Sequence, residues 1–272
     1  MSKAFLKWAG GKKWFIDQLG SSLPKDYNRY IEPFLGGGSV FFYMEPSKAI
    51  LSDINQELID TYLSVKNDLR NVYIDLQNHV DNHSEEYYYM LREQSFVLGS
   101  SEAAARMIYL NKACFNGIYR VNNDGKFNVP YGRKKRILID KEGLVSSSRA
   151  LQPAEIICQN FTKTIGRARK GDFLFCDPPY AVKGDNDLFV SYTKTSFSWN
   201  DQLKLAHSLK KAKDRGVMIL MTNAAHESIM SLYPKDEFNS VVMNRKCLIA
   251  GAGKSKDFNE FIVWANFDFI LE

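Results

Sequence analysis

The tetrapeptide Asp177-Pro178-Pro179-Tyr180 combines residue types that suit chemistry on an aromatic amine. It directly follows residues 172–176, an apolar segment that predicts a buried strand. Proline fixes φ and has no N–H, so its carbonyl stands as a rigid acceptor beside the Asp177 carboxylate. Two acceptors can bind the two N–H groups of an exocyclic NH₂, and the tyrosine ring offers a face for stacking. A sharp turn that merely ends a strand is the structural alternative.

A glycine-rich loop forms a second candidate site. Residues 30–34 predict a strand, which leads into three glycines at residues 36–38 and then into an apolar helical segment. Glycines let a ligand approach the backbone closely, and the first turn of a helix has N–H groups without partners. The next predicted strand, residues 49–52, ends at Asp53, where an acid can bind ribose hydroxyls. Because the GxGxxG spacing is absent, the loop favours a nucleoside ligand without pyrophosphate, and a structural turn is equally compatible.

A basic hairpin forms the third candidate site. Residues 118–121 and 126–129 flank Asn122-Asn123-Asp124-Gly125, and Asp-Gly suits a turn that needs positive φ. Arg120 lies on this hairpin, and a basic run follows at residues 133–136. Arginine can bind guanine O6 and N7 in the major groove, and a short apolar side chain can wedge into a base stack. A solvated hairpin without a ligand is the alternative.

Strands and helices that can position these groups follow from the hydrophobic periodicity. Apolar residues recur at helical spacing over residues 58–69, 72–80, 87–97 and 103–113. Nearer the C-terminus, a helix is predicted over residues 201–213, and strands over 217–222, 241–243 and 260–265. The last two of these strands are expected to form a near-hairpin pair.

The alternation of strands and helices at both ends indicates one α/β domain interrupted by an insertion. A mainly parallel sheet is expected, because strands that alternate with helices form βαβ units. We place the sheet domain in residues 1–55 and 156–272, and the helical insertion with its hairpin in residues 56–155.

Composition excludes several classes of protein. The 272 residues are 45% hydrophobic and 25% charged, which is neither a disordered tail nor a fibrous repeat. A net charge of +5 permits a polyanionic partner without requiring one. We expect a cytoplasmic protein without a signal peptide or membrane span. His79 and His83 stand at helical spacing without a zinc-protease glutamate, so we expect solvated histidines and no metal site.

Together these residues resemble the Dam-type DNA N6-adenine methyltransferases, the class with the order cofactor loop, recognition domain and DPPY motif. The resemblance runs essentially from end to end. It implies a Rossmann-like methyltransferase sheet, mostly parallel with the last strand antiparallel, and a recognition domain in the insertion. It rests on Phe5-Leu6-Lys7-Trp8-Ala9-Gly10-Gly11-Lys12, Glu32-Pro33-Phe34-Leu35-Gly36-Gly37-Gly38, Ser52-Asp53-Ile54-Asn55, Phe115-Asn116-Gly117-Ile118-Tyr119-Arg120, Phe127-Asn128-Val129-Pro130-Tyr131-Gly132-Arg133 and Asp177-Pro178-Pro179-Tyr180.

The resemblance implies S-adenosylmethionine as the cofactor and Asp177, Pro178, Pro179 and Tyr180 as the catalytic residues. Lys12 would meet a carboxylate, Asp53 would bind the ribose hydroxyls, and Phe161 would lie beside the adenine of the cofactor. The implied cofactor-binding set is Trp8, Ala9, Gly10, Lys12, Glu32, Phe34, Gly36, Gly38, Asp53, Ile54, Phe161 and Asp177.

The resemblance also implies double-stranded DNA as the partner and a flipped-out target adenine. Lys7 and Arg120 would contact guanine, Asn116 and Ile118 the disturbed base stack, and Pro130 a base. Because Lys7 and Arg120 are both present, as in members that methylate GATC, GATC is our hypothesis for the site. The implied DNA-binding set is Lys7, Asn116, Ile118, Arg120, Pro130, Arg133 and Lys134.

Two positions depart from the family pattern. Residues 245–254 lack the serines that family members often carry before the last strand, which puts DNA contacts by this loop in doubt. Lys134 stands at a position that is often aromatic.

Other functions stay open at this point. Cytosine N4 is also an exocyclic amine, although Asp at the head of the motif favours adenine. A DNA-binding relative without catalysis would not need Trp8, Lys12, Asp53 and Asp177. A small-molecule or protein methyltransferase would not need the basic hairpin. No obligate protein partner is indicated, and we expect a monomer or weak dimer.

Overall fold

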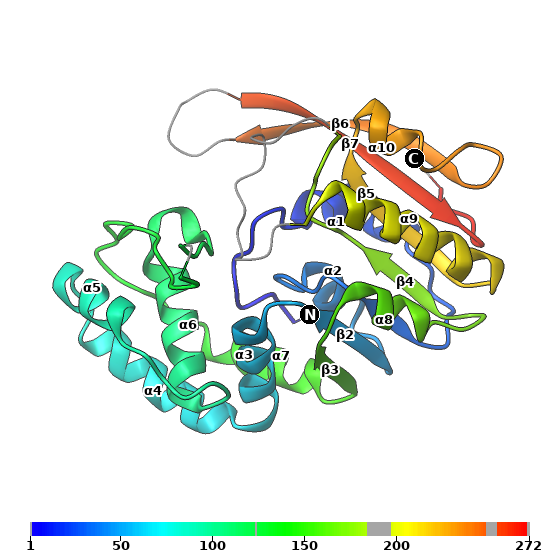
Figure 1. The fold of residues 1–272 in the computed structure, drawn as a ribbon. Coiled ribbons are helices and arrows are strands. Elements are labelled where there is room, and N and C mark those ends of the chain that lie inside the picture. The colour runs from blue at the N-terminus through cyan, green and yellow to red at the C-terminus, as the bar shows by residue number, and fades with distance from the viewer. Residues whose placement is uncertain (1, 123, 184–196, 249–254, 271–272) are drawn as a thin grey trace.

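A computed structural model describes residues 2–122, 124–183, 197–248 and 255–270 (Figure 1). At its centre lies a seven-stranded sheet with the order β3-β2-β1-β4-β5-β7-β6. Its strands are β1 (Tyr30–Glu32), β2 (Ala49–Asp53), β3 (Ala154–Cys158), β4 (Phe173–Cys176), β5 (Met218–Ala224), β6 (Asn239–Leu248) and β7 (Ser255–Ala265). The first five strands pair in parallel, whereas β7 pairs antiparallel with both β5 and β6. The predicted mostly parallel α/β sheet with an antiparallel end is confirmed.

Both faces of the sheet are covered, which explains the continuous apolar runs of its inner strands. Along β4, Phe173 and Phe175 enter one core, while Leu174 and Cys176 enter the other. The second core packs under α8 (Phe161–Gly166), α9 (Trp199–Asp214) and α10 (Glu227–Met230). The first core packs under α1 (Lys13–Leu19) and α2 (Ser39–Met44) and continues through the insertion as far as Leu151.

The insertion between β2 and β3 is helical, as predicted. It contains α3 (Gln56–Asn67), α4 (Leu69–Asp81), α5 (Glu85–Glu93), α6 (Ser101–Ala113) and α7 (Lys141–Leu151). Side-chain oxygens of Asn55, Ser84, Ser100 and Asp140 cap four of these helices. The sequence analysis did not anticipate α7. Figure 1 shows α4 to α6 as a lobe to one side of the sheet, with the N-terminal segment running between the two.

The predicted hairpin is less regular than expected. One isolated antiparallel bridge joins Val121 to Phe127. The described residues of the hairpin form no strand beyond this bridge. The Asn128 N–H donates to the Arg120 carbonyl at 3.1 Å, which closes the base of the hairpin. Gly125 has φ +81°, so the expected positive φ at the turn is confirmed. Short 3₁₀ turns, η1 (Gly20–Ser22) and η2 (Phe115–Gly117), complete the described elements.

The prediction of solvated histidines is wrong for His79. Its side chain is buried on the face of α4 that packs against α6, and His83 is half-buried nearby. Tyrosine hydroxyls make this possible, because the Tyr87 hydroxyl lies 2.7 Å from His79 Nδ1 and the Tyr109 hydroxyl lies 2.7 Å from His83 Nδ1.

Among the described residues, no group of three or more His, Cys, Asp or Glu side chains could hold a metal ion. None of the described helices is long and apolar enough to cross a membrane.

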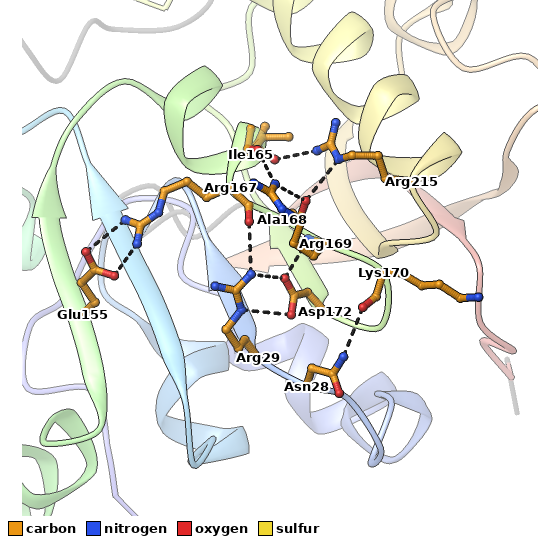
Figure 2. A network of polar contacts seen from close by, with 11 residues as sticks. Asn28, Arg29, Glu155, Ile165, Arg167, Ala168, Arg169, Lys170, Asp172 and Arg215 are labelled. Carbon is orange, nitrogen blue, oxygen red and sulfur yellow. Dashed lines mark hydrogen bonds and ion pairs between the residues drawn. The ribbon is translucent and has the colours of Figure 1, made fainter.

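An ion pair joins the chain segments that enter β1 and β4 (Figure 2). Arg29 binds Asp172 through two hydrogen bonds, Nε to Oδ1 at 3.1 Å and Nη2 to Oδ2 at 2.6 Å. The Asp172 side chain is 2% exposed and also accepts the Arg169 N–H at 2.8 Å. The network therefore fixes the amino ends of the central strands and leaves their carboxyl ends, on the opposite edge, to hold the candidate site.

Candidate active site and DNA-recognition surface

Asp177 lies at the carboxyl end of β4, where parallel sheets bind their ligands. The Thr222 hydroxyl, on the neighbouring β5, donates to Oδ1 of Asp177 at 2.8 Å. The Lys12 ammonium lies 2.7 Å from Oδ2. The two contacts fix the plane of the carboxylate, which the sequence alone could not specify. Pro178 is buried and Pro179 is exposed beside it.

A second carboxylate, which is buried, completes this cluster. Glu260 on β7 lies 3.4 Å from the Lys12 ammonium and accepts a short hydrogen bond from the Tyr180 hydroxyl. Lys12 also donates to the Gly10 carbonyl at 2.9 Å and to the Tyr180 oxygen at 3.3 Å. The Lys12 side chain is 4% exposed and the Glu260 side chain 2%. Lys12 thus meets carboxylates of the protein itself, and its implied contact with the cofactor stays a prediction.

The surroundings of Tyr180 in this cluster, and those of Glu32 at the end of β1, favour the neutral form of each side chain. Burial, followed by the negative charges of Asp177 and Glu260, raises the pKa of Tyr180 well above its usual range. Burial also raises the pKa of Glu32 well above its usual range, although a hydrogen bond from the Tyr30 hydroxyl opposes the shift. Tyr180 is therefore a hydrogen-bond donor at neutral pH. Glu32 lies buried at the end of β1, just before the glycine loop.

The glycine loop is held against Asp53 at the end of β2. The Gly36 N–H donates to Oδ2 of Asp53 at 3.0 Å, and the Asn55 N–H donates to Oδ1 at 3.0 Å. Gly36 has φ +47° and Gly38 has φ +63°, a region that favours glycine. Burial raises the pKa of Asp53, and the three backbone N–H groups that it accepts oppose this shift. The loop and the acid thus form one unit, a contact that was not predicted from the sequence.

Aromatic rings lie beside this unit. Phe34 stacks on Phe161 with ring centroids 5.2 Å apart, and Phe197 packs against Phe34 edge-on at 5.6 Å. A flat ring between two others needs about 7 Å, twice the carbon contact distance of about 3.5 Å. A bound adenine would therefore lie against this cluster and not between Phe34 and Phe161. Ile54 is 53% exposed at the same edge.

Trp8 links the loop to the insertion. Its ring stacks on Tyr119 with centroids 4.8 Å apart and an interplanar angle of 19°. A Cβ at Gly36 would lie 2.8 Å from the Trp8 ring, so glycine is required there for packing as well as for φ. Ala9 and Gly10 are exposed beside Trp8. These residues form the boundary between the glycine loop and the hairpin.

Lys7 and the beginning of the hairpin lie together, 110 residues apart in sequence. Lys7 is exposed, and a Cβ at Gly117 would lie 2.5 Å from its Cδ. Asn116 is exposed with φ +56°, and Ile118 is half-buried. Phe115 at the same turn is 47% exposed. The structure therefore brings Lys7, Asn116 and Ile118 to one surface, although only the resemblance connected them.

Arg120 is oriented across the hairpin. Its Nε donates to the Asn128 side-chain oxygen at 2.8 Å, and Nη2 donates to the Asn128 carbonyl at 3.3 Å. Pro130 is exposed, and its carbonyl accepts the Phe115 N–H at 2.9 Å. The far arm of the hairpin is thus bonded to the turn that carries Asn116.

The first two side chains of the basic run differ in their surroundings. Arg133 is exposed with φ +53°, whereas the Lys134 ammonium bends inward to the Lys112 carbonyl. Burial, then the nearby positive charges of Lys7 and Lys134, lowers the pKa of Lys112. Three lysines therefore gather beneath the hairpin, and Lys112 is a member that the sequence analysis missed. Residues 249–254, six of the ten residues of the atypical segment 245–254, fall outside the described part of the chain.

The matches to known proteins decide the family. Residues 8–247 match the D12 class N6 adenine-specific DNA methyltransferases. The chain belongs to this family. It is 36% identical to the Type II methyltransferase M1.LlaDCHI of Lactococcus lactis, across 89% of this chain and 88% of that protein. It is 35% identical to M.MjaIII of Methanocaldococcus jannaschii (96% and 98%) and 34% to a DNA adenine methylase of Vibrio cholerae (93% and 93%).

Membership in this family confirms the resemblance and the assignment as an adenine-specific DNA methyltransferase. Within this methyltransferase, Thr222 and Glu260 are site residues that the sequence analysis missed. Both stand in apolar strands whose pattern indicates core residues, and their partners lie 45 and 80 residues away. The sequence held one signal for Glu260, which is an acid at the start of the apolar segment 260–265. An acid buried in such a strand needs a charged or hydrogen-bonding partner.

Proposed function

We propose that this DNA methyltransferase uses S-adenosylmethionine to methylate N6 of a flipped-out adenine in duplex DNA, at GATC. The observation that carries this proposal is the Asp177 carboxylate, held by Thr222 and Lys12 at the carboxyl edge of the sheet. An acceptor fixed in this way is suited to an N–H group of an exocyclic amine.

The chain's residues fit the proposed cofactor. Gly36 and Gly38 give the loop its positive-φ turns, and Asp53 has further lone pairs for ribose hydroxyls. The half-buried ring of Phe34, which stacks on the buried ring of Phe161, offers an apolar surface for an adenine. When bound, S-adenosylmethionine supplies an electrophilic methyl group. The proposed contacts are those of Trp8, Ala9, Gly10, Lys12, Glu32, Phe34, Gly36, Gly38, Asp53, Ile54, Phe161 and Asp177.

Asp177, Pro178 and Tyr180 would act on the target base. The N6 lone pair of adenine is delocalised into the ring, which makes it a poor nucleophile. Hydrogen bonds from N6–H to the Asp177 carboxylate and the Pro178 carbonyl localise that lone pair and aim it at the methyl group. The Tyr180 ring stacks on the base, and Pro179 stiffens the turn that carries it. Orientation supplies much of the rate, since the transfer needs little else.

The DNA-binding surface is proposed to be formed by the insertion, residues 56–155, together with Lys7. Extraction of the base leaves a gap in the stack, and Asn116, Ile118 and the exposed ring of Phe115 lie where such a gap can be filled. Lys7 and Arg120 are proposed to bind guanines, which is the basis for GATC. Pro130 would touch a base, while Arg133 and Lys134 contribute positive charge. The monomeric or weakly dimeric state and the cytoplasmic location stay predictions.

Methyl transfer on a defined duplex tests the proposal. We expect nucleoside analysis of a duplex with one GATC, treated with enzyme and S-adenosylmethionine, to show N6-methyladenine. Asp177→Ala should abolish transfer and leave DNA binding intact. Continued turnover by Asp177→Ala would contradict the catalytic assignment. An enzyme without activity on GATC but with activity on other adenine sites would overturn the site and keep the chemistry.

A further inference from the structure

We infer that Asn111 is a positioning residue for base recognition, because it joins Lys7 to the turn before the hairpin. Asn111 stands in the last turn of α6 and is 1% exposed. No step of the proposed chemistry uses it, and neither its place in an apolar helix nor the family motifs indicated a role. The inference deepens the proposed function, since it rests on base contact by Lys7.

Three hydrogen bonds define the connection. Oδ1 of Asn111 accepts the Lys7 N–H at 2.8 Å, and Nδ2 donates to the Lys7 carbonyl at 2.8 Å. Nδ2 also donates to the Gly117 carbonyl at 3.2 Å. These partners determine the orientation of the amide, because carbonyls only accept and a backbone N–H only donates. One side chain therefore holds both backbone polar groups of Lys7 and one of the turn.

The side chain of Lys7 is held as well. Gly117, with φ +67°, lies so close that a Cβ there would be 2.5 Å from Lys7 Cδ. The Lys7 stem thus lies on the backbone of the turn that presents Asn116 and Ile118. Since Lys7 and the turn come from distant parts of the chain, their relative position depends on contacts such as those of Asn111.

The same connection reaches toward the cofactor loop. Trp8 follows Lys7 directly and stacks on Tyr119, two residues after Gly117. The Tyr119 hydroxyl donates to Glu57 at 2.8 Å, which holds it to the beginning of α3. Asn111 therefore bonds to the proposed recognition lysine and to the turn before the hairpin at a place next to the proposed cofactor segment.

The test compares site discrimination, meaning the ratio of kcat/KM on the methylated site to that on duplexes with one base replaced. The duplex carries whichever sequence the wild-type enzyme methylates. The variants are Asn111→Ala, the near-isosteric Asn111→Asp, Lys7→Ala and the double variant Lys7→Ala/Asn111→Ala. We expect Asn111→Ala to lower discrimination at the base read by Lys7 by about tenfold, with the dissociation constant for S-adenosylmethionine little changed.

Ser147→Ala is the matched control. Ser147 is also fully buried, and its hydroxyl donates to the Lys3 carbonyl of the same N-terminal segment at 2.8 Å. It should lower the melting temperature and leave discrimination unchanged. If Asn111→Ala does not fold, Asn111→Asp tests the same point, because it keeps the acceptor and loses both bonds from Nδ2.

The double variant separates positioning from general destabilisation. If Asn111 acts through Lys7, the double variant should discriminate no worse than Lys7→Ala alone. Losses that multiply, or wild-type discrimination in both Asn111 variants, would overturn the inference. Unchanged discrimination in Lys7→Ala with a loss in Asn111→Ala would overturn it too. If Lys7→Ala and Asn111→Ala both match the wild type, the proposed guanine contact of Lys7 fails as well.

Discussion

At the scale of single residues, the Lys12 ammonium lies between Asp177 and Glu260, two carboxylates with different surroundings. Asp177 is 19% exposed and can reach a substrate, whereas Glu260 is buried and also binds the Tyr180 hydroxyl. Glu260 therefore holds both Lys12 and Tyr180 from a buried position. It is a positioning residue of the site.

Replacing Glu260 by glutamine should lower kcat by about tenfold to a hundredfold, because small displacements of reacting groups have effects of that size. The dissociation constant for DNA should stay within about twofold of the wild type. Single-turnover methylation and DNA titration measure the two quantities. Glu155→Gln, which changes an exposed glutamate paired with Arg167, is the control. An unchanged kcat in Glu260→Gln would contradict the role.

His79 predicts how stability depends on pH. Burial lowers its pKa from the ordinary 6.5, so the unfolded state binds a proton more readily than the folded state. The stability that neutral His79 contributes is present above pH 6.5 and is lost as pH falls below it. His79→Gln should therefore show a smaller drop in melting temperature between pH 7.5 and 5.5. His207→Gln, on the exposed surface of α9, should behave as the wild type, and equal drops in all three proteins would refute the prediction.

At the scale of elements, the amino ends of β1 and β4 are joined by the Arg29–Asp172 pair (Figure 2). Arg29→Ala would leave the carboxylate of Asp172 buried without its charge partner, at a cost of about 3 kcal/mol in the free energy of unfolding. Arg167→Ala removes an exposed pair with Glu155 and should cost less than about 1 kcal/mol. Urea denaturation measures the free energy of unfolding of both variants. Similar losses would show that the buried Arg29–Asp172 pair stabilises the fold no more than the exposed Arg167–Glu155 pair.

Elements were predictable from the sequence where one local signal determined them. The run 172–176 predicted β4, and the adjacent motif placed Asp177 at its carboxyl end. The Asp-Gly turn predicted a hairpin, and the structure has one isolated bridge there, Val121 to Phe127, with backbone hydrogen bonds on either side of it and no longer ladder. Asn111 and Glu260 were not predictable, since the residues next to each in sequence do not indicate its partners, which lie far away along the chain.

At the scale of the whole molecule, the net charge of +5 gives little indication of where DNA binds. Its arrangement is more informative, because Lys7, Lys112 and Lys134 gather beneath the hairpin and Arg133 lies exposed beside them. Exposed Lys135 and Arg136 continue the same run. The acids of the site, in contrast, lie at the carboxyl edge of the sheet.

This arrangement predicts a steep dependence of DNA binding on salt. Each phosphate contact contributes about 0.9 to the slope of log K against log salt concentration. Replacing Lys135 and Arg136 by alanine should reduce that slope by up to about 1.8. Sequence preference should not change. Titrations at several salt concentrations measure the slope, and a slope equal to that of the wild type would place these two residues away from the DNA.

Modified-base sequencing of unmethylated genomic DNA, treated with the enzyme and S-adenosylmethionine, tests the central claim most directly. It reports the base, the modified atom and the sequence context together. The account predicts N6-methyladenine at GATC on both strands and no modification by Asp177→Ala. Methylation of cytosine N4, or adenine methylation without a common context, would contradict it.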